Sequence, residues 1–214
     1  MKTILLTGFE PFGDASINPS WEAVQYVSER WNGLARLHAA RLPVEFEEGA
    51  ERLRAMVELL RPDIVVATGL AAGRATVTPE VIAINRIDAR IPDNSGAQPY
   101  DAPVVSGGPD GLFSTLPVKA MVAAMREAGV PATLSYSAGT FVCNSTFYAL
   151  MDMIRRQERP MIGGFIHVPA MPQSGPGGDL PTMSVETTAR GLEAALMVCL
   201  GGADAFVGSM GTVA

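Results

Sequence analysis

Residues 138–169 read AGTFVCNSTFYALMDMIRRQERPMIGGFIHVP, and this stretch has the clearest alternation of predicted elements in the chain. An apolar, strand-like run stops at Cys143, and an amphipathic helix is predicted over 144–157. The apolar side chains of this helix recur at three- and four-residue steps: Phe147, Leu150, Met151 and Ile154. A second apolar run covers 161–168 and ends at Pro169. Strand, helix and strand form a βαβ unit, so both strands are expected to end at the same edge of a parallel sheet.

The rest of the chain alternates in the same way. Strands are predicted over about 2–9, 35–42, 63–68, 77–87 and 132–137, and helices follow from Asn18, over 46–60, over 117–128 and over 184–199. This order predicts one α/β domain over 1–214, an open, twisted, mostly parallel sheet with helices on both faces. The exception is 88–116, which is rich in Pro, Gly, Asp and Ser. An irregular stretch of that length indicates a substrate loop or lid.

Cys143 is the first candidate for chemistry. It lies at or just before the predicted helix N-terminus, where free backbone N–H groups favour negative charge, so the thiol is expected to ionise more readily than a core cysteine. A thiolate attacks carbonyl groups. The alternative is a small apolar residue at a strand end. The other cysteine, Cys199, continues an apolar helical stripe and is interpreted as core packing.

A partner for Cys143 is expected from the following strand. If the two strands of the βαβ unit are neighbours, they lie about 4.8 Å apart. Cys143 and His167 then share the sheet edge at which open α/β sheets generally bind ligands. A satisfied core histidine is the alternative for His167. The second histidine, His38, lies in a predicted strand with no nucleophile near it in sequence.

A third group is needed to orient the imidazole ring. Glu80 is the candidate because it is a carboxylate that borders an otherwise apolar strand. A solvent-facing residue on an edge strand would have the same pattern. Asp88 and Asp93 are competitors because they lie in the predicted loop.

Composition limits the class of protein. The chain has 214 residues, 48% of them apolar, and a formal net charge of −6, which argues against nucleic acid as the main partner. No run approaches the roughly 18 apolar residues of a membrane span, and the N-terminus does not read as a signal peptide, so a cytoplasmic protein is expected. Two cysteines make no disulfide framework, and two histidines without CxxC or HExxH predict no metal site.

Four blocks of the sequence are similar to those of a known family. They are 6–13 with 18–21, 80–94, 139–144 and 167–169. The chain resembles the pyroglutamyl peptidase I family, also called pyrrolidone-carboxylate peptidases, over nearly its whole length. The resemblance implies a cytosolic cysteine peptidase, often a homotetramer, without metal or organic cofactor, that removes an N-terminal pyroglutamyl residue from peptides. It also implies a triad of Cys143, His167 and Glu80.

By the same resemblance, an apolar slot holds the five-membered lactam ring. The residues expected to line it are Phe9, Phe12, Ile91, Phe141 and Val142. Asn18 is expected to fix the backbone around the slot. Arg90 is a candidate for stabilising an oxyanion, with a loop ion pair as the alternative.

One residue departs from the family pattern, because many members have Gln where this chain has Leu70. Lactam recognition is therefore expected to differ in detail. Two rival functions stay open. The first is a small-molecule-binding or phosphorylase-like protein, suggested by 69–74, although that segment fits neither the dinucleotide fingerprint nor the P-loop. The second is an amidase with altered acyl specificity.

Overall fold

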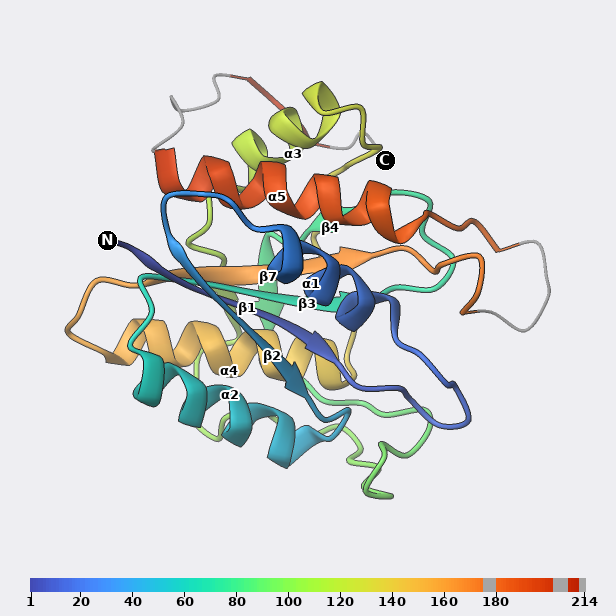
Figure 1. Ribbon diagram of the computed structural model, residues 1–214. Coiled ribbons are helices and arrows are strands. Elements are labelled where there is room, and N and C mark those ends of the chain that lie inside the picture. Colours follow the sequence, from blue (N-terminus) through green and yellow to red (C-terminus); the bar gives the residue numbers. More distant parts are fainter. Residues whose placement is uncertain (175–179, 202–207, 212–214) are drawn as a thin grey trace.

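A computed structural model describes residues 1–174, 180–201 and 208–211 of the chain. Its centre is a five-stranded sheet in the order β2-β1-β3-β7-β4 (Figure 1). The parallel strands are β1 (Thr3–Phe9), β2 (Arg36–Leu42), β3 (Ile64–Leu70) and β7 (Ile162–Val168). The short β4 (Thr78–Pro79) pairs antiparallel with β7, and β5 (Ile82–Ile84) with β6 (Gly111–Phe113) makes a separate ribbon.

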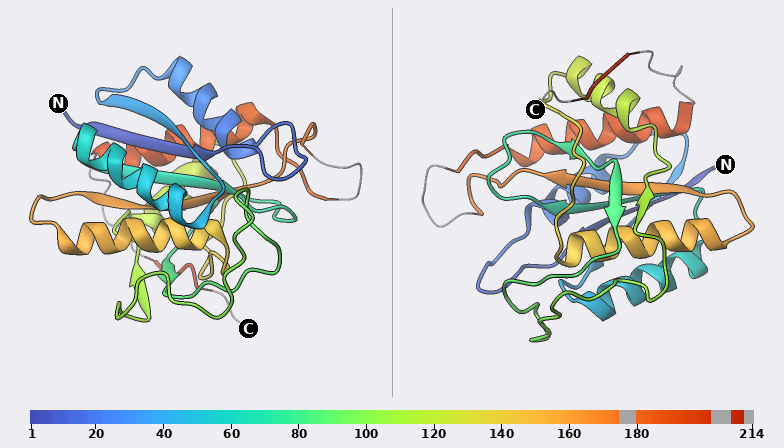
Figure 2. Two further views of the ribbon diagram at one scale, coloured as in Figure 1. Left: turned by 90° about the horizontal axis from the view of Figure 1, so that it is seen from below. Right: turned by 180° about the vertical axis from the view of Figure 1, so that it is seen from behind.

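Helices cover both faces of the sheet, which confirms the predicted fold class (Figures 1 and 2). One layer contains α1 (Pro19–Arg30), α3 (Val118–Glu127) and α5 (Val185–Gly201), with α5 packed between the other two. The opposite layer contains α2 (Phe46–Leu60) and α4 (Val142–Arg156), which lie side by side. Each core forms between one helical layer and the sheet.

The strands distribute their side chains by the period-2 rule. On β3, Ile64 and Val66 join the core under α1 and α5, whereas Val65 and Ala67 join the core under α4. On β7, Phe165 packs into the α4 core. Since His167 is two residues further along, it faces the same side as Phe165, toward α4.

The sequence prediction is wrong for two strands. Residues 77–87 do not form one strand, because Glu80 lies between β4 and β5. Residues 132–137 form no strand and make only isolated bridges, between Val77 and Ala132 and between Glu80 and Ser135. The predicted βαβ unit is also wrong, because the run that stops at Cys143 forms no strand before α4, and the neighbours of β7 are β3 and β4.

The segment 88–116 is less irregular than expected, since its last part contains β6, which pairs antiparallel with β5. Asp93 anchors the first part of this segment. One carboxylate oxygen accepts from the backbone N–H of Phe46 at the start of α2 (2.9 Å), and the other accepts from Ser95 and Ala97. Among the described helices, none combines the length and apolar character that crossing a membrane requires.

Candidate active site

Cys143 is the second residue of α4. The helix runs antiparallel to the strand that follows it, so its N-terminus lies at the carboxyl end of β7. The residue before the helix is Phe141, whose side chain has no polar atom with which to cap it. By contrast, Asn18 caps α1 and Asp93 bonds the first N–H of α2. The first backbone N–H groups of α4 are thus left for other acceptors.

His167 is placed beside this thiol by β3. Gly69 of β3 is in register with His167. A Cβ atom added to Gly69 would lie 2.8 Å from Cys143 Sγ and 2.8 Å from Phe165 Cζ. Glycine is therefore required there for the thiol to lie over β3 next to the histidine. The His167 ring packs against the Phe165 ring in a tilted arrangement, with centroids 4.9 Å apart and an interplanar angle of 57°, and His167 is 3% exposed.

Glu80 completes the cluster from the position directly after β4, where its backbone bridges Ser135. Its Oε1 lies 2.7 Å from His167 Nδ1, and the residue is 0% exposed. The solvent-facing alternative for Glu80 is therefore wrong. Neither competitor holds this position, because Asp93 bonds the start of α2 and Asp88 is exposed at the edge of a hollow.

Arg74 holds the same carboxylate oxygen. Its Nη1 donates to Glu80 Oε1 and to Thr78 Oγ1, both at 2.7 Å, and its Nη2 donates to the carbonyl oxygen of Ser137 at 3.0 Å. Sequence reasoning missed this role. The sequence pattern of 69–74 suggested a possible phosphate loop and gave no sign that Arg74 pairs with Glu80. In the structure a turn rather than a helix follows β3, and Arg74 is paired with a carboxylate, so the segment lacks the helix N-terminus that a phosphate loop uses.

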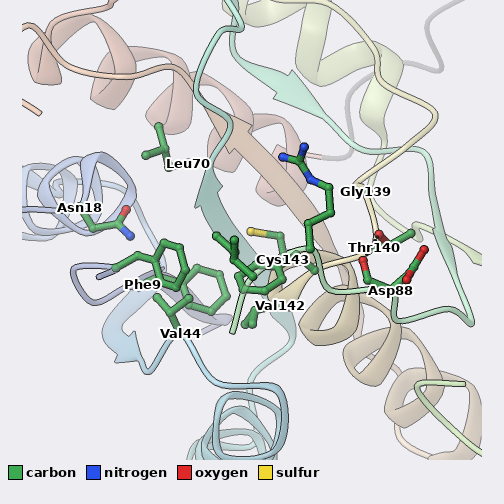
Figure 3. A pocket seen from close by; sticks show the side chains of 13 residues that line it. Phe9, Asn18, Val44, Leu70, Asp88, Gly139, Thr140, Val142 and Cys143 are labelled. Carbon is green, nitrogen blue, oxygen red and sulfur yellow. Dashed lines mark hydrogen bonds between the residues drawn. The ribbon is translucent and has the colours of Figure 1, made fainter. Parts of the chain in front are cut away.

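A hollow of about 520 Å³ opens beside Cys143 (Figure 3). Phe9 and Val44 lie on one side of the thiol, and Asp88 and Thr140 on the other. All of the residues predicted from the resemblance line it: Phe9, Phe12, Asn18, Arg90, Ile91, Phe141 and Val142. Leu70 and the backbone of Gly139 also contribute. The hollow is thus mostly apolar with a few polar anchors, as small-molecule sites generally are.

Hydrogen bonds hold the walls of this hollow together. Asn18 accepts from the N–H of Ser20 (3.0 Å) and donates to the carbonyl of Glu10 (2.8 Å). Thr140 and Asp88 exchange two bonds, from Thr140 Oγ1 to the Asp88 carbonyl (3.0 Å) and from the Asp88 N–H to the Thr140 carbonyl (3.1 Å). The segment that bears Arg90 and the one that bears Cys143 are therefore tied directly.

Asn144 was also missed by sequence reasoning. Its side chain accepts from the N–H of Ile84 (3.0 Å) and donates to the carbonyls of Ile84 (2.9 Å) and Arg86 (3.0 Å). It is fully buried directly after Cys143. A polar residue in the first helical turn was the only signal in the sequence, and it did not indicate the partner segment.

Comparisons with known proteins find relatives over nearly the whole chain. Residues 2–201 match the family model described as pyroglutamyl peptidase. A pyrrolidone-carboxylate peptidase of Erwinia tasmaniensis is 51% identical over 203 residues, 94% of this chain and 93% of its own. The chain belongs to the pyroglutamyl peptidase family. The resemblance inferred from the four sequence blocks is therefore confirmed.

Solved structures from this family have the same fold. The structure of pyroglutamyl peptidase I from Bacillus amyloliquefaciens superimposes with a TM-score of 0.90 at 41% identity, covering 93% of this chain and 97% of the other. The pyrrolidone carboxyl peptidase from Thermococcus litoralis gives a TM-score of 0.89 at 38% identity, covering 94% of each chain.

In this member of the pyroglutamyl peptidase family, burial and pairing set the charges of His167 and Glu80. Burial favours the protonated carboxyl of Glu80, but the hydrogen bond and charge of His167, together with Arg74, outweigh it and lower the pKa. Burial lowers the pKa of His167 and prevails over the bond to Glu80, which raises it. At neutral pH an ionised Glu80 therefore accepts from Nδ1–H of a neutral imidazole, which leaves the Nε2 lone pair as a base.

The expectation that Cys143 ionises readily is wrong for the resting site. Burial raises the pKa of its thiol to about 12, the negative charge of Glu80 adds to this, and Arg74 opposes it. The half-buried thiol rests over Gly69 of β3 at the wall of the hollow, where desolvation opposes the helix N-terminus. A neutral thiol beside a neutral imidazole requires that the proton moves during attack.

Proposed function

We propose that this chain hydrolyses the amide bond that follows an N-terminal pyroglutamyl residue in peptides. Cys143 is the nucleophile, His167 the general base and acid, and Glu80 the group that orients the imidazole. The observation that carries the proposal is the bonded pair of His167 and Glu80 beside a thiol at an uncapped helix N-terminus, at the mouth of an apolar hollow. Membership of the pyroglutamyl peptidase family supports the choice of substrate.

The first half of the reaction forms an acyl-enzyme. His167 Nε2 takes the thiol proton while Sγ attacks the carbonyl carbon that joins pyroglutamate to the next residue. The resulting oxyanion is stabilised by backbone N–H groups at the start of α4, which are uncapped and point along the helix axis. The tetrahedral intermediate collapses when His167 returns the proton to the leaving amine, and a thioester to Cys143 remains.

The second half releases pyroglutamate. His167 Nε2 takes a proton from water, the hydroxide attacks the thioester carbonyl, and the sulfur leaves with the proton that His167 carries. Glu80 accepts from Nδ1–H throughout, stabilises the transient imidazolium and is not itself protonated.

The lactam ring occupies the hollow of about 520 Å³. The aromatic rings of Phe12 and Phe141 are in edge contact, with centroids 5.5 Å apart, and form an apolar wall for a flat, uncharged ring. Leu70, where many family members have Gln, lines the hollow without offering a hydrogen bond. The lactam N–H and carbonyl then depend on backbone groups at 139–140 and on Asn18, Asp88 and Arg90. The segment 88–91 acts as the substrate loop within the longer stretch 88–116.

The direct test compares hydrolysis of a fluorogenic pyroglutamyl amide with that of the matching prolyl amide. We expect cleavage of the pyroglutamyl substrate alone. Proline has a charged ring nitrogen at neutral pH, and it lacks the lactam carbonyl that the polar groups of the hollow would bond. Cleavage of both substrates indicates the amidase of altered specificity. Cleavage of neither, together with tight nucleotide binding, contradicts the peptidase proposal in favour of the small-molecule-binding class.

The charge states predict the pH dependence. Only neutral His167 can take the thiol proton, so kcat/KM is expected to be constant above the pKa of His167 and to fall as the pH drops below it. Because burial lowers this pKa, the midpoint of the acid limb lies below 6.5. A pH profile of kcat/KM checks this. An acid limb centred above 6.5 would contradict a buried, neutral imidazole.

The assembly and location of the enzyme stay predictions. A homo-oligomer, tetrameric in many relatives, and a cytoplasmic location are both proposed from the family resemblance and from the thiol chemistry, which suits a reducing compartment.

A further inference from the structure

Two hollows, not one, meet at Cys143. The second has a volume of about 410 Å³. Four residues line both: Leu70, Gly139, Phe141 and Cys143. The thiol therefore stands at a shared wall, and a substrate that is attacked at this point can extend into both spaces.

The position of His167 decides which part of the substrate enters which hollow. His167 lines the second hollow and is not among the described residues that line the first. The proposed reaction requires His167 Nε2 to give a proton to the leaving amine, so that amine must lie on the side of His167. The acyl part then lies in the first hollow, and the chain that follows the scissile bond lies in the second.

We propose that the second hollow binds the residue that follows pyroglutamate and that Ala71 sets the size of residue it accepts. This inference rests on the proposed function. Ala71 lines the hollow and is held in place by a bond from its N–H to the carbonyl of Val168 (3.0 Å). Its methyl group leaves space that a larger side chain at 71 would fill.

The chemistry of the second hollow favours broad acceptance of the following residue. Leu70, Ala71 and Phe141 provide apolar surface, and Ser137 and Gly139 are exposed at its rim. Among the lining residues that the structure describes, Arg74 is the one that is charged at every pH of interest; its side chain is 32% exposed and its charge is balanced by Glu80 at 2.7 Å. Because the described lining has no unbalanced charge, this hollow is expected to discriminate by size rather than by charge.

The experiment measures kcat/KM for pyroglutamyl-glycine, pyroglutamyl-leucine and pyroglutamyl-tryptophan amides with the wild type, Ala71→Phe and Ala71→Leu. We expect the ratio of kcat/KM for tryptophan over glycine to fall about tenfold in Ala71→Phe and by a smaller factor in Ala71→Leu, because the added side chain occupies the hollow. The matched control is Ala72→Phe, which adds the same ring at an exposed neighbour outside the described lining of either hollow. Its ratio is expected to stay at the wild-type value.

A second readout separates the two hollows. Inhibition by 2-pyrrolidone, a lactam without a following residue, is expected to be equal in the wild type and in both Ala71 variants. A tryptophan-to-glycine ratio that is unchanged in a folded Ala71→Phe or Ala71→Leu would overturn the inference, as would an equal loss for all three substrates. A wild type that cleaves none of the substrates would instead overturn the proposed function.

Discussion

Replacement of Cys143 by alanine is expected to lower kcat/KM for a pyroglutamyl amide by roughly five orders of magnitude. Without the thiol no acyl-enzyme forms, and only binding and the N–H groups of α4 stay to assist direct attack by water. The fold is expected to persist, because the thiol lies beside a hollow rather than inside a filled core. Steady-state kinetics, with circular dichroism to verify folding, measure the effect.

Cys199→Ala is the matched control. The second cysteine is buried on α5 in the core of the opposite helical layer, where its thiol only packs. Activity is therefore expected to stay within a factor of two of the wild type, with some loss of thermal stability from the small cavity. If Cys143→Ala kept more than a hundredth of the wild-type activity, or Cys199→Ala lost it, Cys143 would not be the nucleophile.

Glu80→Gln is expected to reduce kcat by roughly 10²- to 10⁴-fold with little change in KM. The amide has the size of the carboxylate but no charge to stabilise the imidazolium, and its NH₂ group can face Nδ1 and favour the wrong tautomer. Because Glu80 is outside the described lining of both hollows, substrate binding is not expected to change. The acid limb of the pH profile is expected to move to lower pH, since the carboxylate raises the pKa of His167.

Asp152→Asn provides the comparison for this second variant. Asp152 is also a carboxylate paired with arginine, bonding Arg155 (2.8 Å) and Arg156 (2.6 Å) within α4. Replacing this carboxylate by an amide tests how much the loss of a carboxylate–arginine pair alone lowers activity. We expect kcat to stay at the wild-type value. A Glu80→Gln enzyme with wild-type kcat and an unmoved acid limb would show that Glu80 does not orient His167.

Local patterns were sufficient for much of this protein. The apolar spacing of α2 and α5, the Asn18 cap of α1 and the mostly apolar run of β3 are decided by residues within a few positions of one another. Such short-range preferences can be read from the chain directly. Cys143, His167 and Glu80 could be singled out because reactive side chains are scarce, and the family resemblance indicated the lining of the hollow.

The errors arose where pairing is set at long range. Glu80 was placed at the edge of a strand, but the backbone there breaks to pair β4 with β7 on one side and to bridge Ser135 on the other. The segment 132–137 forms no strand, because its pairing is limited to isolated bridges with Val77 and Glu80 in this same broken stretch of backbone. The βαβ argument placed Cys143 next to His167 for an incorrect reason, since β3 and not the segment before α4 is the neighbour of β7.

Residue patterns along the chain thus predicted the layered α/β fold, the family, and the thiol, imidazole and carboxylate that we propose to react. How these three groups are arranged depends on the tertiary structure. It placed Gly69 under the sulfur, Arg74 on the oxygen that His167 shares, and a second hollow on the side of His167. It also set the charges, because a pKa depends on burial and on neighbours from distant segments, which no local pattern encodes.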